Sequence, residues 1–340
     1  MTKAEVRQMT NRKRALLKRM QTRYAPIRRM RIPSWVASAP WFKESGLIKI
    51  LEVYALLAFM FEGFSGKIAA AFKILLEEEA AGHLASKPIV VAATSGNFGF
   101  AMAMLLVSLR KVFDVGGFIA VVESTTSPGK LAHLRRSGAL VVIADGMTAI
   151  QRADQFKSRV GYLVINQYTH MGNVRGQEWA ANKIYRFFKD RLSVFVAAVG
   201  STASIVGAKL YLEKLIPGIK FVGVGSSSKK DKVPGSRPEE DLGVTGFGYE
   251  EALAYYKLVT SVSKKEAFEA SQELISNGIS AGPTSGLTIA GFFKLLEQEY
   301  RAGRLNAMKN KYGKIVVCCL FMDMFLPYVE EYDAVLGVAS

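Results

Sequence analysis

Short apolar runs rich in β-branched residues recur along the chain and alternate with longer stretches of helical character. Runs of this kind, bounded by glycine and polar residues, predict buried strands, and the stretches between them predict helices. Because the runs are continuously apolar, we expect parallel sheets that helices cover on both faces. The expected strands are 89–93, 117–122, 139–144, 162–165, 194–199, 220–225, 258–262 and 315–321.

The length of the chain predicts more than one hydrophobic core. At 340 residues it exceeds the size at which a single core stops growing, so two domains are expected. We expect a basic N-terminal arm over 1–40, a first α/β domain over 41–170 and a second over 171–340. The ligand site of such sheets lies at the carboxyl ends of the strands, which favours a cleft between the domains. The polar stretch 226–248 is expected to be a mobile loop near that site or a solvated excursion.

Three predicted strand–loop–helix junctions carry small hydroxyl residues and glycines. They are 94–99 (Thr-Ser-Gly-Asn-Phe-Gly), 199–204 (Val-Gly-Ser-Thr-Ala-Ser) and 282–286 (Gly-Pro-Thr-Ser-Gly). Backbone N–H groups at a helix start bind anions, so each junction is a candidate ligand loop. Taken singly, each is better explained as an ordinary turn whose Ser, Thr or Asn caps a helix.

Taken together and in this order, these segments resemble the cysteine synthase and tryptophan synthase β family, the fold type II pyridoxal-phosphate enzymes. Segment 61–67 (Phe-Glu-Gly-Phe-Ser-Gly-Lys) resembles the family segment ending in the lysine that carries the cofactor. Segment 93–99 resembles its substrate-carboxylate loop, 200–204 its phosphate cup and 282–286 its Gly-x-Ser-Ser-Gly turn. The resemblance covers about residues 45 to 330. It implies two three-layer α/β domains with largely parallel sheets and an interdomain cleft.

The resemblance also implies site residues and a cofactor, pyridoxal 5'-phosphate. Lys67 would hold the cofactor and serve as the base. The alternative without a catalytic role is that Lys67 is an ordinary surface lysine. Lys73 is the second candidate for the cofactor lysine. Asn97 would contact both the substrate and the ring oxygen of the cofactor, or simply cap the following helix. The implied substrate-carboxylate residues are Thr94, Ser95, Gly96, Asn97 and Gln167. The implied cofactor-binding residues are Lys67, Asn97, Gly200, Ser201, Thr202, Ala203, Ser204 and Thr284.

These residues favour replacement at the β-carbon of a serine-derived amino acid, as in a cysteine synthase. A β-eliminating lyase or deaminase is the close alternative, and a catalytically degenerate member that binds a phosphorylated ligand or a partner is another. Three departures favour the degenerate reading: a short lysine segment, Thr202 and Ala203 where glycines are common, and Met324 at the position of a serine that contacts the pyridine nitrogen.

The charge of the chain is concentrated at its N-terminus. Residues 1–32 hold eleven Lys or Arg and one acid, Glu5, within a total net charge of +16. This composition is typical of a transit peptide, an RNA-binding arm or an anionic-surface anchor. We favour an amphipathic helix that packs on a neighbouring surface through Val6, Met9, Leu16, Leu17 and Met20. Nucleic acid is the least favoured partner, because no aromatic residue is interleaved before Tyr24.

The cysteines, the histidines and the longest apolar stretch bear on whether the protein has disulfides, a metal site or a membrane span. Cys318 and Cys319 are adjacent in an apolar run, so they predict buried thiols in a reducing compartment rather than a disulfide. The histidines are scattered and predict no metal site. The apolar stretch 47–61 is short for a membrane span and contains Lys49 and Glu52. We therefore expect a soluble cytoplasmic protein with a small amino-acid substrate and, on the family precedent, a homodimer.

Overall fold

The computed structural model divides into two compact units. It describes residues 9–22, 25–61, 65–94, 96–108, 111–244 and 257–337. The first unit is Met1–Ala25 with Met60–Trp179, and the second is Pro26–Phe59 with Ala180–Ser340. The two units therefore differ from the expected division into consecutive segments with boundaries at residues 40 and 170. Segment 26–59 folds with the C-terminal part of the chain.

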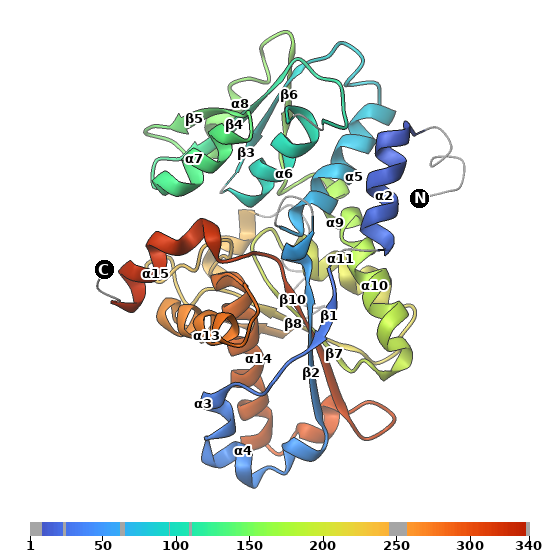
Figure 1. The fold of residues 1–340 in the computed structure, drawn as a ribbon, viewed down its shortest axis with the longest axis vertical. Helices are drawn as coiled ribbons and strands as arrows, with labels where there is room; N and C mark the ends of the chain where they lie inside the picture. The colour runs from blue at the N-terminus through green and yellow to red at the C-terminus, as the bar shows by residue number, and fades with distance from the viewer. Residues whose placement is uncertain are drawn as a thin grey trace. The chain divides into compact units, whose positions relative to one another are not determined.

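The first unit is a three-layer α/β structure built on a parallel sheet in the order β5-β4-β3-β6. Helices α5 and α6 lie on one face of this sheet and α8 on the other (Figure 1). Alternate residues of β3 point to opposite faces: Val90 belongs to the core under α5 and α6, whereas Val91 belongs to the core under α8. Its elements are α2 (Asn11–Thr22), α5 (Lys67–Ala80), β3 (Ile89–Ala93), α6 (Asn97–Leu106), β4 (Gly117–Glu123), α7 (Pro128–Arg136), β5 (Leu140–Ala144), α8 (Ala149–Asp154), β6 (Tyr162–Ile165) and α9 (Met171–Gly176).

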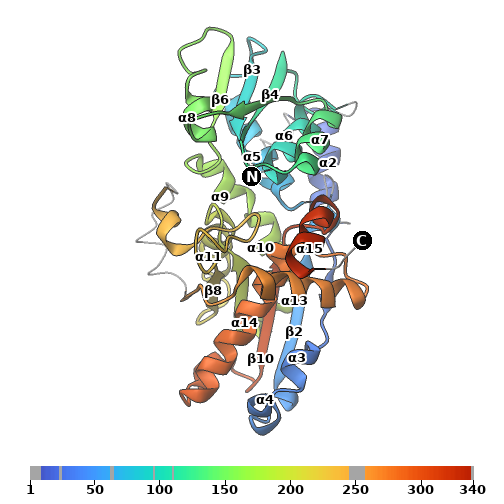
Figure 2. The ribbon, with the colours of Figure 1, turned by 90° about the vertical axis from the view of Figure 1, so that its left-hand side faces the viewer.

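The second unit is a six-stranded sheet in the order β1-β2-β10-β7-β8-β9, in which β1 alone is antiparallel to its neighbour. Helix α14 runs along β10 on one face (Figure 2), and α11 packs on β7 and β8. The strands are β1 (Ile27–Arg29), β2 (Leu51–Leu57), β7 (Val194–Ala198), β8 (Lys220–Val224), β9 (Lys257–Val259) and β10 (Ile315–Phe321). The helices are α3 (Ser34–Ala37), α4 (Pro40–Glu44), α10 (Glu178–Phe188), α11 (Ala203–Leu212), α13 (Lys264–Ser276), α14 (Pro283–Arg301) and α15 (Val329–Leu336). The short 3-10 turns are η1 (Leu47–Lys49), η2 (Ala58–Met60), η3 (Lys189–Arg191), η4 (Glu239–Val244), η5 (Leu305–Met308) and η6 (Leu326–Tyr328).

The α/β class and the parallel sheets are confirmed, and every expected strand is present. The sequence pattern did not predict β1 or β2. Strand β2 lies within the apolar stretch 47–61 and pairs with β1 on one side and β10 on the other. No helix in the described part of the chain is long and apolar enough to cross a membrane.

The basic arm contributes a helix that packs on its own unit. Leu16 of α2 is only 1% exposed and joins the core of the first unit. Lys13 is buried as well: it pairs with Glu79 and lies 4.5 Å from the ring centroid of Phe113. The packing interpretation is therefore supported for Leu16. Val6 and the side chain of Met20 lie outside the described residues.

The two cysteines are buried free thiols in β10, as expected. Burial raises the pKa of Cys318 to about 12 and also raises that of Cys319. Both thiols are therefore protonated and unreactive at neutral pH. Among the described residues, no group of His, Cys, Asp and Glu could hold a metal ion.

Candidate active site

Lys67 is the first residue of α5, and its surroundings differ from those of every ordinary surface lysine. Its backbone N–H donates to Ser65 Oγ at 3.2 Å, which fixes the start of the helix. The next residues, Ile68 and Ala69, are buried in the core. Burial lowers the pKa of the Lys67 amine to about 8. A larger fraction of this amine is therefore neutral at pH 7 than of an ordinary lysine amine.

Lys73, the second candidate, has a different environment. Its ammonium lies 3.4 Å from Glu77 Oε1, one turn along the same helix. The Lys73 side chain is thus held on the surface of the helix by a carboxylate and not by an apolar pocket. The local chemistry therefore separates the two lysines in favour of Lys67. Residues 62–64 of the lysine segment lie outside the described residues.

The loop after β3 is folded around the hydroxyl of Thr94. Thr94 Oγ1 accepts from the N–H groups of Gly96 at 3.1 Å and Gly99 at 2.8 Å. Gly96 has a φ of 133°, which side-chain-bearing residues rarely adopt. A Cβ on Gly99 would lie 2.5 Å from Thr94 Cγ2. The buried Thr94 therefore shapes the loop, and both glycines are required for its path.

Helix α6 begins at Asn97, and Gly96 occupies the N-cap position with no side-chain cap bond. Asn97 is thus not the capping residue of α6, so the alternative in which it only caps this helix is not supported. The start of a helix attracts an anion such as a carboxylate, although in α6 the Gly99 N–H already donates to the Thr94 hydroxyl. Ser95 lies outside the described residues.

Gln167 joins this loop because β6 lies beside β3 in the sheet. Its Nε2 donates to the carbonyl of Ala93 at 3.2 Å, and Asn173 Nδ2 donates to the Gln167 carbonyl at 2.7 Å. The structure therefore brings Thr94, Gly96, Asn97 and Gln167 together at one sheet edge. Sequence reasoning missed Lys130, whose Cδ lies 3.6 Å from the position of a Cβ on Gly96. Lys130 lies on α7, and no local sequence pattern distinguishes it from the other basic residues of that helix.

In the second unit, the loop after β7 leads into α11 with no side-chain cap bond at Thr202. Thr202 itself has a φ of 60°, a left-handed conformation that favours glycine, and its hydroxyl donates to the Ser201 carbonyl at 2.7 Å. This is one of the positions where the family commonly has glycine. The backbone keeps the glycine-like path although the residue is threonine.

Residues 226–237 pack against this loop instead of forming a solvated excursion. Arg237 N donates to the Val199 carbonyl at 2.8 Å, and the hydroxyls of Ser226 and Ser236 lie 2.5 Å apart. A Cβ on Gly200 would lie 2.4 Å from the Gly235 carbonyl oxygen. Of the two expectations for this stretch, its described part supports a position near the site.

The third junction is filled by a carboxylate of the chain itself. Asp323 is 1% exposed, and its two oxygens accept from the backbone N–H groups of Thr284 at 3.0 Å and Ser285 at 3.1 Å. Both hydroxyls donate to it as well, at 2.5 Å and 2.7 Å. Burial raises the pKa of Asp323, while these hydrogen bonds oppose the shift. The start of α14 is therefore not an open anion site, which corrects the expectation for 282–286.

The geometry of the separate parts fits the chemistry of pyridoxal phosphate. An aldehyde requires a neutral amine, and the partly desolvated Lys67 supplies one. A phosphate requires N–H donors at a helix start, and α11 presents its first turn without a side-chain cap. Thr284 Oγ1 also lies 3.2 Å from the Pro234 carbonyl, next to the Gly235 that covers the α11 loop.

Comparisons with known proteins agree with this reading. The model of a family described as pyridoxal-phosphate dependent enzyme matches residues 40–307. A cysteine synthase of Helicobacter pylori is 27% identical over 266 residues, which cover 73% of this chain and 82% of that protein.

Solved structures share the fold. A hydrogen sulfide-producing enzyme from Fusobacterium nucleatum superposes with a TM-score of 0.73 at 21% identity, over 92% of this chain and 97% of that one. An O-ureido-L-serine synthase gives a TM-score of 0.73 at 22% identity, over 96% of each chain.

Proposed function

The chain belongs to the family of pyridoxal-phosphate-dependent enzymes, and from this premise we propose that it catalyses β-replacement on a serine-derived amino acid. The observation that carries the proposal is Lys67, whose amine has a pKa lowered to about 8 at the head of α5. Cysteine synthases among the relatives favour a sulfur nucleophile.

Lys67 would hold pyridoxal 5'-phosphate, which when bound supplies an electron sink for the α-carbon of the substrate. Lys67 Nζ would also be the group that accepts the α-proton of the substrate. The depressed pKa suits this step, because a base works best when its pKa lies near the working pH. Loss of the leaving group from Cβ and addition of a nucleophile there complete the replacement.

The residues around Thr94 would bind the substrate carboxylate. Backbone N–H groups at the start of α6 and the side chains of Ser95, Asn97 and Gln167 are the proposed donors, while buried Thr94 holds the loop in shape. The aliphatic part of Lys130 borders this loop and places a cation on the adjacent helix.

The loop before α11 would hold the cofactor phosphate. Its proposed binding residues are Gly200, Ser201, Thr202, Ala203 and Ser204, with Thr284 nearby. The positive end of the α11 dipole adds to the attraction of a dianion. On the family precedent, we further propose a cytoplasmic homodimer.

Elimination is the second candidate, because it shares each step up to loss of the leaving group. Met324, at the position of the family serine, favours the degenerate alternative, because a thioether cannot donate to the ring nitrogen. The buried amine of Lys67, with its lowered pKa, opposes the degenerate alternative.

The test is to reduce the cofactor-loaded protein with borohydride, digest it and map the pyridoxyl adduct. We expect the adduct on Lys67; an adduct on Lys73 would show that the assignment of the lysine is wrong. Activity is then followed with O-acetyl-L-serine and sulfide. Cysteine formation supports replacement, pyruvate without sulfide dependence supports elimination, and a bound cofactor with neither product supports the degenerate alternative. Lys67→Ala is the inactive control and Lys73→Ala the active one.

A further inference from the structure

A cavity of about 410 Å³ lies within the second unit, between the segment around β1 and the C-terminal end of α13. It is separate from Thr284, Asp323 and the α11 loop, none of which lines it. Its size falls in the range of small-molecule sites.

The floor of the cavity is apolar. Met30, Leu274, Ile279 and Ile289 line it, and all are buried in the core of the unit. The strap 30–34 is fixed above α13, because the Ser34 N–H donates to Glu273 Oε1 at 2.6 Å. The left-handed turn at Gly278 and the bond from Asn277 Nδ2 to the Glu273 carbonyl at 2.8 Å hold the other wall. The walls are therefore preformed.

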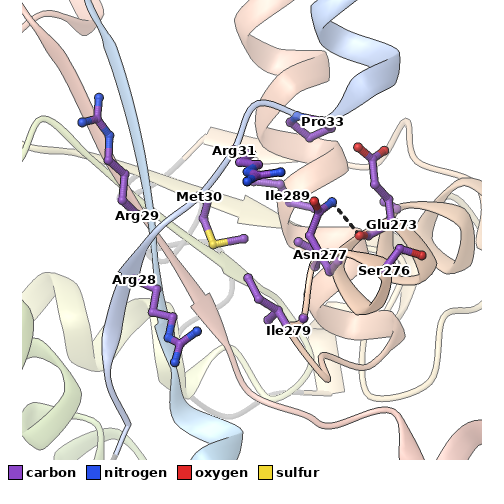
Figure 3. A pocket seen from close by; sticks show the side chains of 13 residues that line it. Arg28, Arg29, Met30, Arg31, Pro33, Glu273, Ser276, Asn277, Ile279 and Ile289 are labelled. Carbon is purple, nitrogen blue, oxygen red and sulfur yellow. Dashed lines mark hydrogen bonds between the residues drawn. The ribbon is translucent and has the colours of Figure 1, made fainter.

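The rim is cationic. Arg28, Arg29 and Arg31 border the cavity. The backbone of Arg28 pairs with Ala55 of β2, but the side chains of Arg28 and Arg31 form no ion pair or hydrogen bond with any residue in the described ranges. Figure 3 shows Arg31 on the side of Asn277 and Ile289, whereas the side chain of Arg29 extends away from them. Arg28 and Met30 share one face, because side chains alternate along an extended strand. Arg31 lies beyond the end of β1 and does not follow this alternation.

We propose that this cavity binds a small carboxylate with an aliphatic body. Guanidinium groups match a carboxylate through paired N–H donors, and the apolar floor covers an aliphatic chain. Among the described residues that line the cavity, Glu273 is the only acid, and the negative end of α13 lies beside it. Both disfavour a dianion such as phosphate relative to a singly charged carboxylate. Glu273 and the end of α13 would also attract an ammonium group. The carboxylate could therefore belong to an aliphatic amino acid or to a simple aliphatic acid.

The test is calorimetric titration of the cofactor-loaded protein with L-leucine, 4-methylpentanoate, isoamylamine and inorganic phosphate. We expect saturable binding of one or both carboxylates and none of isoamylamine or phosphate. The stronger carboxylate identifies whether an ammonium contributes. The R28A/R31A variant should bind at least tenfold more weakly, and R29A, which removes the same kind of charge, should stay within twofold of the native protein.

Two controls separate this site from the proposed catalytic one. Binding should persist in K67A and leave the visible spectrum of the native protein unchanged. The charge-conserving R31K should bind with intermediate strength, which keeps the test valid if R28A/R31A is unstable. Equal loss in R29A and R28A/R31A, loss in K67A, or an effect of R28A/R31A on oligomeric state alone would overturn the proposal.

Discussion

The burial of the Lys67 amine should make the free energy of unfolding depend on pH. Its pKa in the folded protein is about 8, below the ordinary 10.5, so folding disfavours its charged form. The neutral fraction at pH 7 is therefore larger than for an ordinary lysine. The cost of burying the ammonium is fully present below pH 8 and disappears as pH rises toward 10.5.

We therefore expect Lys67→Met to stabilise cofactor-free protein at pH 7, with the advantage shrinking between pH 8 and 10.5. Urea unfolding at a series of pH values measures it. Lys73→Met is the matched control: it removes an ion pair with Glu77 and should destabilise by at most about 1 kcal/mol. An advantage for Lys67→Met that does not change with pH would contradict the assigned desolvation.

Asp323 is the second residue with a strong individual effect. Asp323→Ala removes the carboxylate that accepts from two N–H groups and two hydroxyls at the start of α14. The Thr284 N–H then has no other acceptor among the described residues, whereas the Thr284 hydroxyl keeps the Pro234 carbonyl at 3.2 Å and the Ser285 N–H keeps the Gly282 carbonyl at 3.0 Å. Each unsatisfied buried group costs about 1–3 kcal/mol, and we expect a total loss of about 3 kcal/mol or more in thermal or chemical unfolding. Exposed Asp333→Ala on α15 is the control and should change the unfolding free energy by less than about 0.5 kcal/mol. A similarly small effect of Asp323→Ala would show that the network is dispensable.

Residue types in local motifs could be predicted from the sequence, whereas contacts between distant segments could not. Lys67 and the 94–99 loop were recognisable because the residues adjoin a predicted strand or helix. The hydrogen bonds of Asp323 join it to Thr284, 39 residues away, and nothing in either segment specifies the other. The same holds for Lys130 beside Gly96.

At the scale of elements, the loop between β3 and α6 depends on one close contact. A methyl group on Gly99 would meet Thr94 Cγ2 at 2.5 Å. We expect Gly99→Ala to destabilise by about 1–3 kcal/mol, as overpacking does, and to weaken substrate binding by distorting the loop. Thr94→Ser removes the clashing methyl and keeps the hydroxyl, so Thr94→Ser with Gly99→Ala should recover part of the loss. Purely additive effects in this double-mutant cycle would argue against the contact.

Elements with strong apolar runs were predictable, and weak ones were not. Strands β3, β6 and β10 have the predicted bounds because each is a continuous apolar run. Strand β1 is a three-residue edge strand with two arginines, a pattern that also fits a solvated arm. Strand β2 is hidden in a longer apolar stretch that includes two 3-10 turns.

The packing of α2 gives a prediction for the basic arm. Leu16→Ala removes a side chain that is buried in the core of the first unit, so we expect a loss of about 2–4 kcal/mol in unfolding free energy. Leu17, which is only partly buried, is the matched control, and Leu17→Ala should cost clearly less. Equal and small effects would mean that the arm is not part of the folded core in solution.

At the scale of the whole molecule, the chain passes between the two units more than once. Segment 26–59 leaves the first unit, supplies β1 and β2 to the second and is followed by the main part of the first. Strand β2 pairs with β10 along all of its length, from Leu51 opposite Ile315 to Leu57 opposite Phe321. Its Val53 and Ala55 are also part of the core of the second unit.

This topology predicts which fragments fold. Residues 60–179 keep all four strands of the first sheet and should give a cooperative unfolding transition, although weakened by the loss of α2. Residues 178–340 lack β2, so β10 becomes an exposed apolar edge, and we expect aggregation or a non-cooperative melt. Joining 26–59 to 178–340 through a flexible Gly/Ser linker should restore folding, because loop closure costs only a few kcal/mol against the recovered pairing and core. Circular dichroism melts and amide dispersion in NMR spectra measure all three. Cooperative folding of 178–340 by itself would show that β2 is not needed for the second core, and failure of the joined fragment would show that this unit requires more of the chain than its own segments.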